Sequence, residues 1–130
     1  MRIYLAAPWV CKAEALAAAT TLEVAGHTIT KKWWEHREVN GYLRDDISTE
    51  QREELMIQAM EDIAGVWNAQ AFILLNGKVS EGKSVETGLA LAYSTPIVLI
   101  GAPSNLFHYL PHVFRVDTIE DAIALLPTLR

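Results

Sequence analysis

Short apolar segments alternate with longer helical patterns along the first half of this chain. Residues 3 to 7 form an apolar run typical of a buried strand, and residues 12 to 25 form an alanine-rich helical pattern that Gly26 closes. Residues 27 to 33 have alternating character and contain β-branched and aromatic side chains, and this pattern predicts a second strand. Residues 35 to 47 are charged and have no steady period, so we expect an exposed loop there.

The alternation continues in the second half. Ser48 and Gln51 form a capping-box pattern at the start of a long helix, and Trp67 belongs to an apolar stripe of this helix that we expect to face the core. The other members of the stripe are Met56, Met60 and Ile63. The elements expected after this helix are strands at 71 to 75, 97 to 100 and 113 to 116, a helix at 83 to 93, and a terminal helix capped by Thr118 and Asp121.

This order of elements predicts a single α/β domain over residues 1–130. Strands that are apolar on both faces favour a parallel sheet with helices on both faces. We expect a flavodoxin-like, Rossmann-like arrangement of five strands in the order 2-1-3-4-5. In such sheets a ligand crevice forms where the strand order reverses, outside the carboxyl ends of the first and third strands. Loops 8 to 11 and 76 to 84 would meet at that crevice.

Composition narrows the range of functions. The chain has 130 residues, is 51% hydrophobic and carries a formal net charge of −5, and a negative surface repels nucleic acid polymers. Binding of a single small phosphate remains compatible with this charge. Cys11 is the only cysteine, so an internal disulfide is excluded and a zinc cluster is disfavoured. No segment reads as a membrane span or a secretory signal, and we expect a cytoplasmic protein with no membrane partner.

Two carboxylates and a phenol could meet at the predicted crevice. Glu86 falls in the first turn of the helix after the third strand, where unpaired backbone N–H groups favour an ionised carboxylate, and we expect it to stay ionised at neutral pH. Tyr4, in the neighbouring first strand, would then reach Glu86. Asp62 would bring a second carboxylate, which is the arrangement used to cleave glycosidic bonds. The alternatives are that Glu86 caps its helix, that Tyr4 is structural, and that Asp62 forms a solvated pair with Glu61.

Further candidates lie in the surrounding loops. Ser80, between Gly77 and Gly82, belongs to a small polar loop before a helix, which suits a phosphate, although neither a P-loop nor a dinucleotide fingerprint is present. Tryptophans at the ends of the first two strands, Trp9, Trp33 and Trp34, could stack on a nucleobase. His108 and His112 lie in a proline-rich loop and are expected at the surface, with no third metal ligand at a suitable spacing.

Three segments taken together resemble the nucleoside 2-deoxyribosyltransferase superfamily, which includes the 2′-deoxynucleoside 5′-monophosphate N-glycosidases. They are IYLAAPW at residues 3 to 9, EDIAGVWNAQAFILL at 61 to 75, and SEGKSVETGLALAYSTPIVLIG at 80 to 101. The resemblance covers nearly the whole chain in order and spacing. It extends to the tail NLFHYLPHVFRVDTIEDAI, which is similar to that of many small, phage-type members.

The resemblance implies roles for these residues. Glu86 matches the nucleophile that attacks the anomeric carbon of deoxyribose, and Tyr4 matches the tyrosine that orients it. Asp62 matches the aspartate near the sugar and the leaving base. Trp9 matches an aromatic residue that flanks the base in some transferases. Ser80 matches the serine that donates to the phosphate in the monophosphate hydrolases, where transferases acting on free nucleosides carry an aspartate.

One departure from the family concerns the phosphate. The hydrolases carry an arginine in the first loop, whereas this chain offers Lys12 there, with Lys83 and Ser84 as substitutes. Ala6 and Gly82 complete the expected substrate contacts.

The resemblance therefore implies cleavage of the N-glycosidic bond of a deoxynucleoside 5′-monophosphate through a glycosyl-enzyme, with a small-molecule nucleotide or nucleoside as partner and without a metal or cofactor. Water as the second acceptor gives hydrolysis, and another base gives transfer. A transferase of free deoxynucleosides and a non-catalytic nucleotide-binding module stay open as alternatives, as does an interaction domain built on the tryptophans and histidines. A homo-oligomer is expected, because members of the family commonly assemble and the 105 to 110 loop and the Met56, Met60 and Trp67 helix are apolar.

Overall fold

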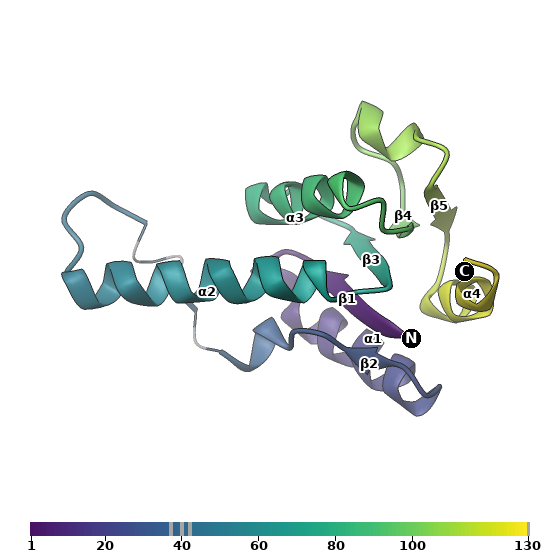
Figure 1. Ribbon diagram of the computed structural model, residues 1–130, viewed down its shortest axis with the longest axis horizontal. Helices are drawn as coiled ribbons and strands as arrows, with labels where there is room; N and C mark the ends of the chain where they lie inside the picture. Colours follow the sequence, from purple (N-terminus) through teal and green to yellow (C-terminus); the bar gives the residue numbers. More distant parts are fainter. Residues whose placement is uncertain (37, 40, 42, 130) are drawn as a thin grey trace.

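A computed structural model describes residues 1–36, 38, 39, 41 and 43–129. Five strands form one parallel sheet in the order β2-β1-β3-β4-β5 (Figure 1). Their bounds are β1 Arg2–Ala6, β2 Thr28–Ile29, β3 Ala71–Asn76, β4 Ile97–Gly101 and β5 Val113–Val116. The predicted α/β fold and its strand order are confirmed.

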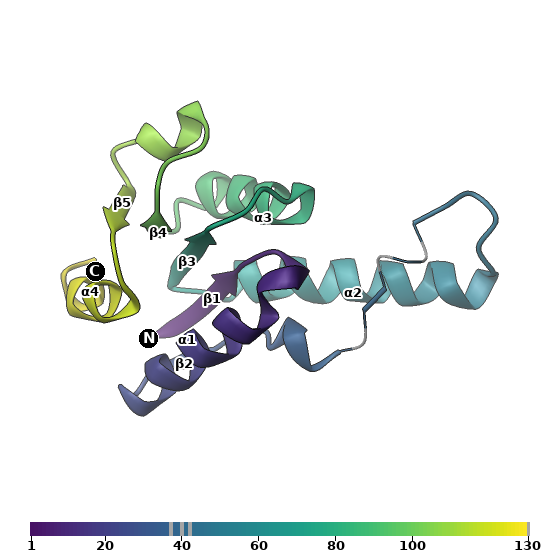
Figure 2. The ribbon, with the colours of Figure 1, turned by 180° about the vertical axis from the view of Figure 1, so that it is seen from behind.

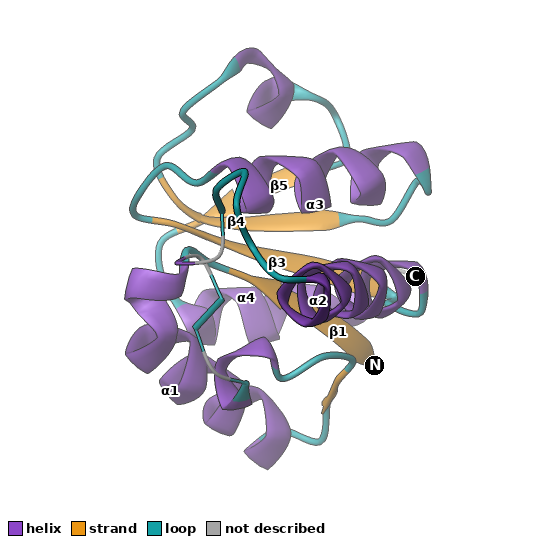
Figure 3. Cartoon of the chain, turned by 90° about the vertical axis from the view of Figure 1, so that its left-hand side faces the viewer, coloured by secondary structure: helices purple, strands orange, loops and turns teal. Residues whose placement is uncertain are grey.

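Helices cover both faces of this sheet. The α-helices are α1 Lys12–Val24, α2 Thr49–Trp67, α3 Glu81–Ala92 and α4 Ile119–Leu125. Short 3-10 helices are η1 Trp9–Cys11, η2 Trp33–Glu35, η4 Leu106–Tyr109 and η5 Leu126–Thr128. Helices α2 and α3 lie on one face and α1 and α4 on the other (Figure 3), and the view from behind shows α1 in front of β1 (Figure 2).

The core is divided by the sheet into two layers, because successive side chains of a strand point to opposite faces. Ile3 and Leu5 of β1 pack towards α1 and α4, whereas Tyr4 packs towards α2 and α3. Tyr4 stacks on Phe72 of β3 with ring centroids 5.6 Å apart and planes 12° apart. Burial on both faces explains why the central strands are continuous apolar runs.

The predicted helix ends are present. The Ser48 hydroxyl accepts from the Gln51 backbone N–H at 3.1 Å, and the Gln51 side chain accepts from the Ser48 N–H at 3.0 Å. Gly26 follows α1 with a φ of +94°, which a glycine adopts without strain. Thr118 caps α4 by accepting from the Asp121 N–H at 3.1 Å.

The second strand is shorter than predicted. Only Thr28 and Ile29 form β2, and Trp33 and Trp34 lie in η2 instead of continuing the strand. The Trp33 indole N–H donates to the Leu5 carbonyl at 2.8 Å, and Trp34 is buried. Both side chains therefore anchor η2 to the core. In the predicted loop of residues 35 to 47, Asp45 and Asp46 form a turn, while Arg37, Asn40 and Tyr42 lie outside the described residues.

The prediction for the apolar stripe of α2 was wrong. Trp67 and Met60 are 66% and 61% exposed, and Met56 and Ile63 are exposed as well. The buried residues of α2 are Gly65 and Val66, and the amino-terminal half of the helix extends beyond the sheet (Figure 1). Asp62 therefore lies on the inward side of the helix with Gly65 and Val66, and the apolar stripe faces outwards.

Candidate active site

A pocket of about 200 Å³ lies at the carboxyl ends of β1 and β3, where the strand order reverses, as the sequence predicted. Its walls come from the connection after β1, from η2 and the segment that follows it, from α2, and from the start of α3. The lining residues are Ala7, Trp9, Trp33, His36, Glu38, Val39, Gln58, Asp62, Ser80, Gly82, Lys83 and Glu86.

Tyr4 and Glu86 form the predicted contact. The Tyr4 hydroxyl donates to Glu86 Oε2 at 2.5 Å. Tyr4 has no exposed surface, and burial, together with the nearby Glu86 and Asp62 charges, raises the pKa of its phenol far above the usual value. The phenol therefore keeps its proton and donates it to one carboxylate oxygen, which leaves the other oxygen of Glu86 without this bond.

The expectation of an ionised Glu86 at neutral pH was wrong. The pKa of Glu86 is raised to about 8, because burial and, to a smaller extent, the charge of Asp62 outweigh the lowering effect of the Tyr4 hydrogen bond. The sequence placed Glu86 in the first turn, but α3 begins at Glu81, two residues earlier than predicted. Glu86 thus lies in the second turn, beyond the unpaired N–H groups that would stabilise its charge.

Asp62 projects into the same pocket from α2. Burial raises the pKa of its carboxyl to about 6, against the lowering effect of the Lys31 charge. Its Oδ1 is buried and has no hydrogen-bond partner in the part of the chain that the structure describes. A buried acceptor left without a donor is costly, and a ligand is a common source of the missing bond.

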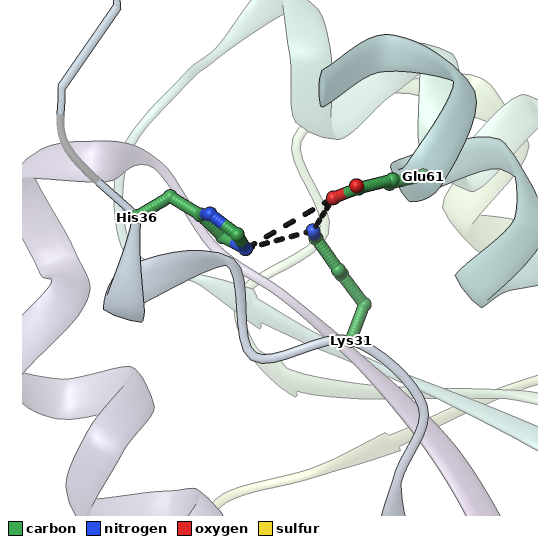
Figure 4. A network of polar contacts seen from close by, with 3 residues as sticks. All are labelled: Lys31, His36 and Glu61. Atoms are coloured by element: carbon green, nitrogen blue, oxygen red, sulfur yellow. Dashed lines mark hydrogen bonds and ion pairs between the residues drawn. The ribbon is translucent and has the colours of Figure 1, made fainter. Parts of the chain in front are cut away.

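Lys31, His36 and Glu61 form a polar network (Figure 4), and all three act on the charge of Asp62. The Lys31 ammonium donates to Glu61 Oε2 and lies 2.9 Å from His36 Nε2. Glu61 therefore pairs with Lys31 rather than forming a solvated pair with Asp62. Nothing in the sequence indicated Lys31, because it follows the end of β2 and belongs to no motif.

Gly65 allows α2 to come close to these residues. A Cβ on Gly65 would lie 2.8 Å from Lys31 Cβ and 3.0 Å from two ring carbons of Tyr4. Any larger residue would have to push the helix, the lysine or the phenol aside. Since Asp62 lies one turn before Gly65, this close approach also fixes the height of Asp62 above the sheet.

Aromatic rings form another wall. Trp9 and Trp33 both line the pocket, with ring centroids 6.1 Å apart and planes inclined by 50°. Trp34 lies behind Trp33, edge to face at 5.4 Å, and is buried. The Lys12 ammonium lies 5.1 Å from the centre of the Trp9 ring. The sequence predicted Trp9 in the site but not Trp33, because the position of Trp33 depends on η2, which the sequence did not predict.

The remaining predicted residues divide into two groups. Ser80, Gly82 and Lys83 line the pocket, and the Ser80 hydroxyl accepts from the Lys83 N–H at 3.3 Å, so its own proton stays available to a ligand. Ser84 is not brought to this pocket, because its hydroxyl donates to the Ser80 carbonyl and its side chain lines a cavity on another side of α3. Ala6 is fully buried in the core, and its neighbour Ala7 lines the pocket instead.

The histidine loop also differs from expectation. His108 is buried rather than exposed at the surface, and its Nδ1 accepts from the Ser104 N–H at 3.0 Å. Within the described residues, no group of three acids, histidines or cysteines could hold a metal ion. No described helix is both long and apolar enough to cross a bilayer.

The high pKa of Glu86 has a consequence for stability. Between its ordinary pKa of 4.5 and its folded value of about 8, the folded state binds more protons at this site than the unfolded state, so stability falls as the pH rises through this window. Glu86→Gln removes this penalty. We expect the variant to melt on the order of 5 °C above the wild type at about pH 8.5, and the difference to vanish near about pH 4.5. Thermal unfolding across this pH range measures it.

The exposed Glu81, in the first turn of the same helix, supplies the control. Glu81→Gln makes the same change in charge without relieving a buried acid, and should give no gain that grows with pH. A difference in melting temperature between Glu86→Gln and the wild type that stays constant at all pH values would contradict the raised pKa of Glu86.

The fold is similar to those of two solved proteins. The CMP N-glycosidase BcmB of Clostridium botulinum superposes with a TM-score of 0.56 at 18% identity, covering 98% of this chain and 99% of that one. The 2-deoxyribosyltransferase of the psychrotolerant bacterium Bacillus psychrosaccharolyticus superposes with a TM-score of 0.62 at 18% identity, covering 99% of this chain and 96% of that one. The sequence matches no protein-family model and no curated protein. Over nearly its whole length the chain thus has the fold that the sequence resemblance implied.

Proposed function

We propose that this chain is an enzyme that cleaves the N-glycosidic bond of 2′-deoxynucleoside 5′-monophosphates. The observation that carries the proposal is the Tyr4 to Glu86 hydrogen bond of 2.5 Å, in a pocket that Asp62 also lines. Two proteins of the same fold, one named a CMP N-glycosidase and the other a 2-deoxyribosyltransferase, support the same class of chemistry.

The mechanism has two steps with Glu86 as the nucleophile. In the first step the Glu86 oxygen that does not bind Tyr4 bonds to the anomeric carbon, the carbon–nitrogen bond breaks, and the leaving base takes a proton from Asp62 or from water. In the second step water attacks the glycosyl ester and gives its proton to the Asp62 carboxylate. The sugar phosphate and free Glu86 are released. Trp9 and Trp33, which together line one wall of the pocket, would flank the base.

The protonation states of Glu86 and Asp62 limit the fraction of enzyme molecules that can carry out the first step. The attacking carboxylate must be ionised, while the leaving nitrogen needs a proton donor. With pKa values of about 8 for Glu86 and about 6 for Asp62, the pair holds one shared proton near neutral pH. The competent form is the one in which this proton lies on Asp62.

The test is to incubate the protein with each deoxynucleoside 5′-monophosphate and each deoxynucleoside, and to follow free base by chromatography. The proposal predicts base release from at least one monophosphate, with a lower rate from the matching nucleoside. The absence of base release from every compound, at enzyme concentrations near those of the substrate, would refute it. Binding of a nucleotide that survives unaltered would instead identify a binding module.

A transferase is the second candidate, and the similarity to the 2-deoxyribosyltransferase favours it. The first step is identical, but a second base rather than water attacks the ester. Adding a different free base to the same reaction distinguishes the two, because a transferase forms the new nucleoside or nucleotide in proportion to that base, whereas a hydrolase does not.

Ser80 is the residue proposed to select for the phosphate. Its hydroxyl donates to a phosphate oxygen, whereas a carboxylate in its place would repel the dianion. We expect Ser80→Asp to lower kcat/KM for the monophosphate by roughly 100-fold and to leave kcat/KM for the nucleoside within a few-fold. Ser80→Asn, which also caps a helix, is the control for the start of α3. An equal loss on both substrates would show a structural effect instead.

We further propose that the chain forms homo-oligomers through the outer face of α2. Met56, Met60, Ile63 and Trp67 expose an apolar stripe there, and Trp67 contacts Tyr93, the residue after α3, edge to face at 4.7 Å. A second copy of the chain, which carries the same stripe, would cover it about a two-fold axis.

Met60→Lys should therefore shift the protein to a smaller species in light scattering coupled to size exclusion. Thr20→Lys introduces the same charge at an exposed position of α1, on the other face of the sheet, and should leave the assembly unchanged. A monomeric wild type, or equal behaviour of both variants, would contradict this assembly.

A further inference from the structure

A second cavity, of about 730 Å³, lies on the side of α3 that faces η4, whereas Glu86 lies on the side that faces α2. This volume falls within the range of small-molecule sites, roughly 300 to 1,000 Å³. The proposed catalytic pair and both pocket-lining tryptophans are absent from its lining. The proposed contacts with the sugar and the base therefore leave this cavity unused, and only Ser80, the proposed phosphate contact, and Lys83 also line the first pocket.

The cavity has an apolar wall and a polar end. Val79, Leu91, Phe107 and Leu110 supply the apolar side. At the polar end, at the carboxyl edge of the sheet, Asn76 bonds through its side-chain N–H to the Ala102 carbonyl and the Ser104 hydroxyl. Such a division suits a ligand that is apolar at one end and charged at the other.

Lys83 determines the sign of that charge. Its side chain is only 5% exposed, and its ammonium donates to Asn76 Oδ1 at 2.9 Å and to the Lys78 carbonyl. No carboxylate of the described residues lies within ion-pair distance of it. Buried ammonium groups are nearly always paired with an anion, and two neutral acceptors leave one N–H of this ammonium to bind one.

We propose that this cavity binds a small amphipathic carboxylate, with its anionic group on Lys83 and its apolar or aromatic body against Val79, Leu91 and Phe107. The nearby Ser104 and Asn105 side chains supply further polar contacts at the same end. The buried His108, held by Ser104, forms part of the wall.

Such a ligand would act on the active site, because Ser80 and Lys83 line both cavities. The single N–H of Lys83 that remains can serve one anion at a time. Resting on the proposed function, this predicts that the ligand raises KM for a deoxynucleoside monophosphate and leaves KM for the nucleoside unchanged.

Binding is measured by calorimetry with 4-phenylbutyrate and with 4-phenylbutan-1-ol, which share the same body but differ in charge. The wild type should bind the acid roughly 10- to 100-fold more tightly than the alcohol. Lys83→Met should remove this preference while retaining the alcohol, with circular dichroism as the check that it folds. Equal affinities in the wild type, or no binding of either compound, would overturn the proposal.

Gly88 offers a variant that fills the cavity. It lines the cavity, and apart from its two chain neighbours and the backbone of its own helix, no described atom lies within 4 Å of where its Cβ would stand. Gly88→Leu should therefore fold, since leucine favours a helix more than glycine does, and should abolish acid binding. Val85→Leu, at an exposed position of the same helix, should bind as the wild type does.

Wild-type affinity in Gly88→Leu would place the ligand elsewhere. This assay requires no turnover, so its outcome is independent of whether the glycosidase proposal holds.

Discussion

Replacing Glu86 with glutamine is expected to reduce base release by about 10³-fold or more, because an amide cannot form the glycosyl ester. Glutamine has nearly the same shape as glutamate, and its amide oxygen can still accept the Tyr4 hydroxyl. The pocket should therefore keep its form while losing its nucleophile. Free base, followed by chromatography with a deoxynucleoside monophosphate as substrate, measures the loss.

Glu81→Gln is the matched control, because Glu81 lies in the first turn of the same helix and does not line the pocket. It should retain wild-type activity. Mass spectrometry of the protein, denatured during turnover, should show a sugar phosphate adduct on the wild type and none on Glu86→Gln. A variant that keeps more than a tenth of the activity would show that another group attacks the sugar.

Repeating local patterns were enough to predict the architecture. The central strands β1, β3 and β4 are runs of apolar residues, and several helix ends carry a signal, such as Ser48 with Gln51. Parallel order follows from alternating strands and helices, and the position of the crevice follows from that order. Tyr4 and Glu86 could therefore be placed together although 82 positions separate them.

Features that depend on packing between elements could not be predicted in the same way. The apolar stripe of α2 is a correct helical pattern, but periodicity does not reveal whether such a stripe meets the sheet or a partner. Here Gly65 and Val66 meet the sheet, and Trp67 is exposed. Lys31 gave no local signal, because its role arises only when α2 brings Glu61 beside it.

The protonation state of Glu86 also could not be predicted from the sequence. A shift of two residues in the start of α3 moves this carboxyl from the first turn to the second. At the first turn backbone N–H groups would stabilise the anion, whereas at the second turn burial dominates and raises the pKa to about 8. An error of this size at a helix boundary is ordinary, yet it changes the expected form of Glu86 at neutral pH from ionised to protonated.

The pair of carboxyl groups predicts a bell-shaped dependence of kcat/KM on pH. Activity requires one proton shared between Glu86 and Asp62, so it should rise through about pH 6, peak near about pH 7 and fall through about pH 8. Below this window both groups are protonated and no nucleophile is available. Above it both are ionised, and Asp62 no longer has a proton to give to the leaving base.

Asp62→Asn should lower kcat/KM by about 100-fold or more and change the shape of this profile. With the donor removed, activity depends only on ionisation of Glu86, so it should rise with pH to a plateau and lose its alkaline limb. The midpoint should lie below about pH 8, because the charge of Asp62 no longer raises the pKa of Glu86. Initial rates across the pH range give both the slope and the midpoint.

A leaving group that needs no proton separates this role from a structural one. The 4-nitrophenyl glycoside of deoxyribose 5-phosphate releases a stabilised phenolate, so Asp62→Asn should release nitrophenolate in the first turnover nearly as fast as the wild type does. Glu86→Gln should cleave neither substrate, because the nucleophile is needed whatever group departs. If Asp62→Asn lost both activities equally, Asp62 would be holding the pocket together through its position beside Lys31 and Gly65, and proton transfer to the base would have to come from water.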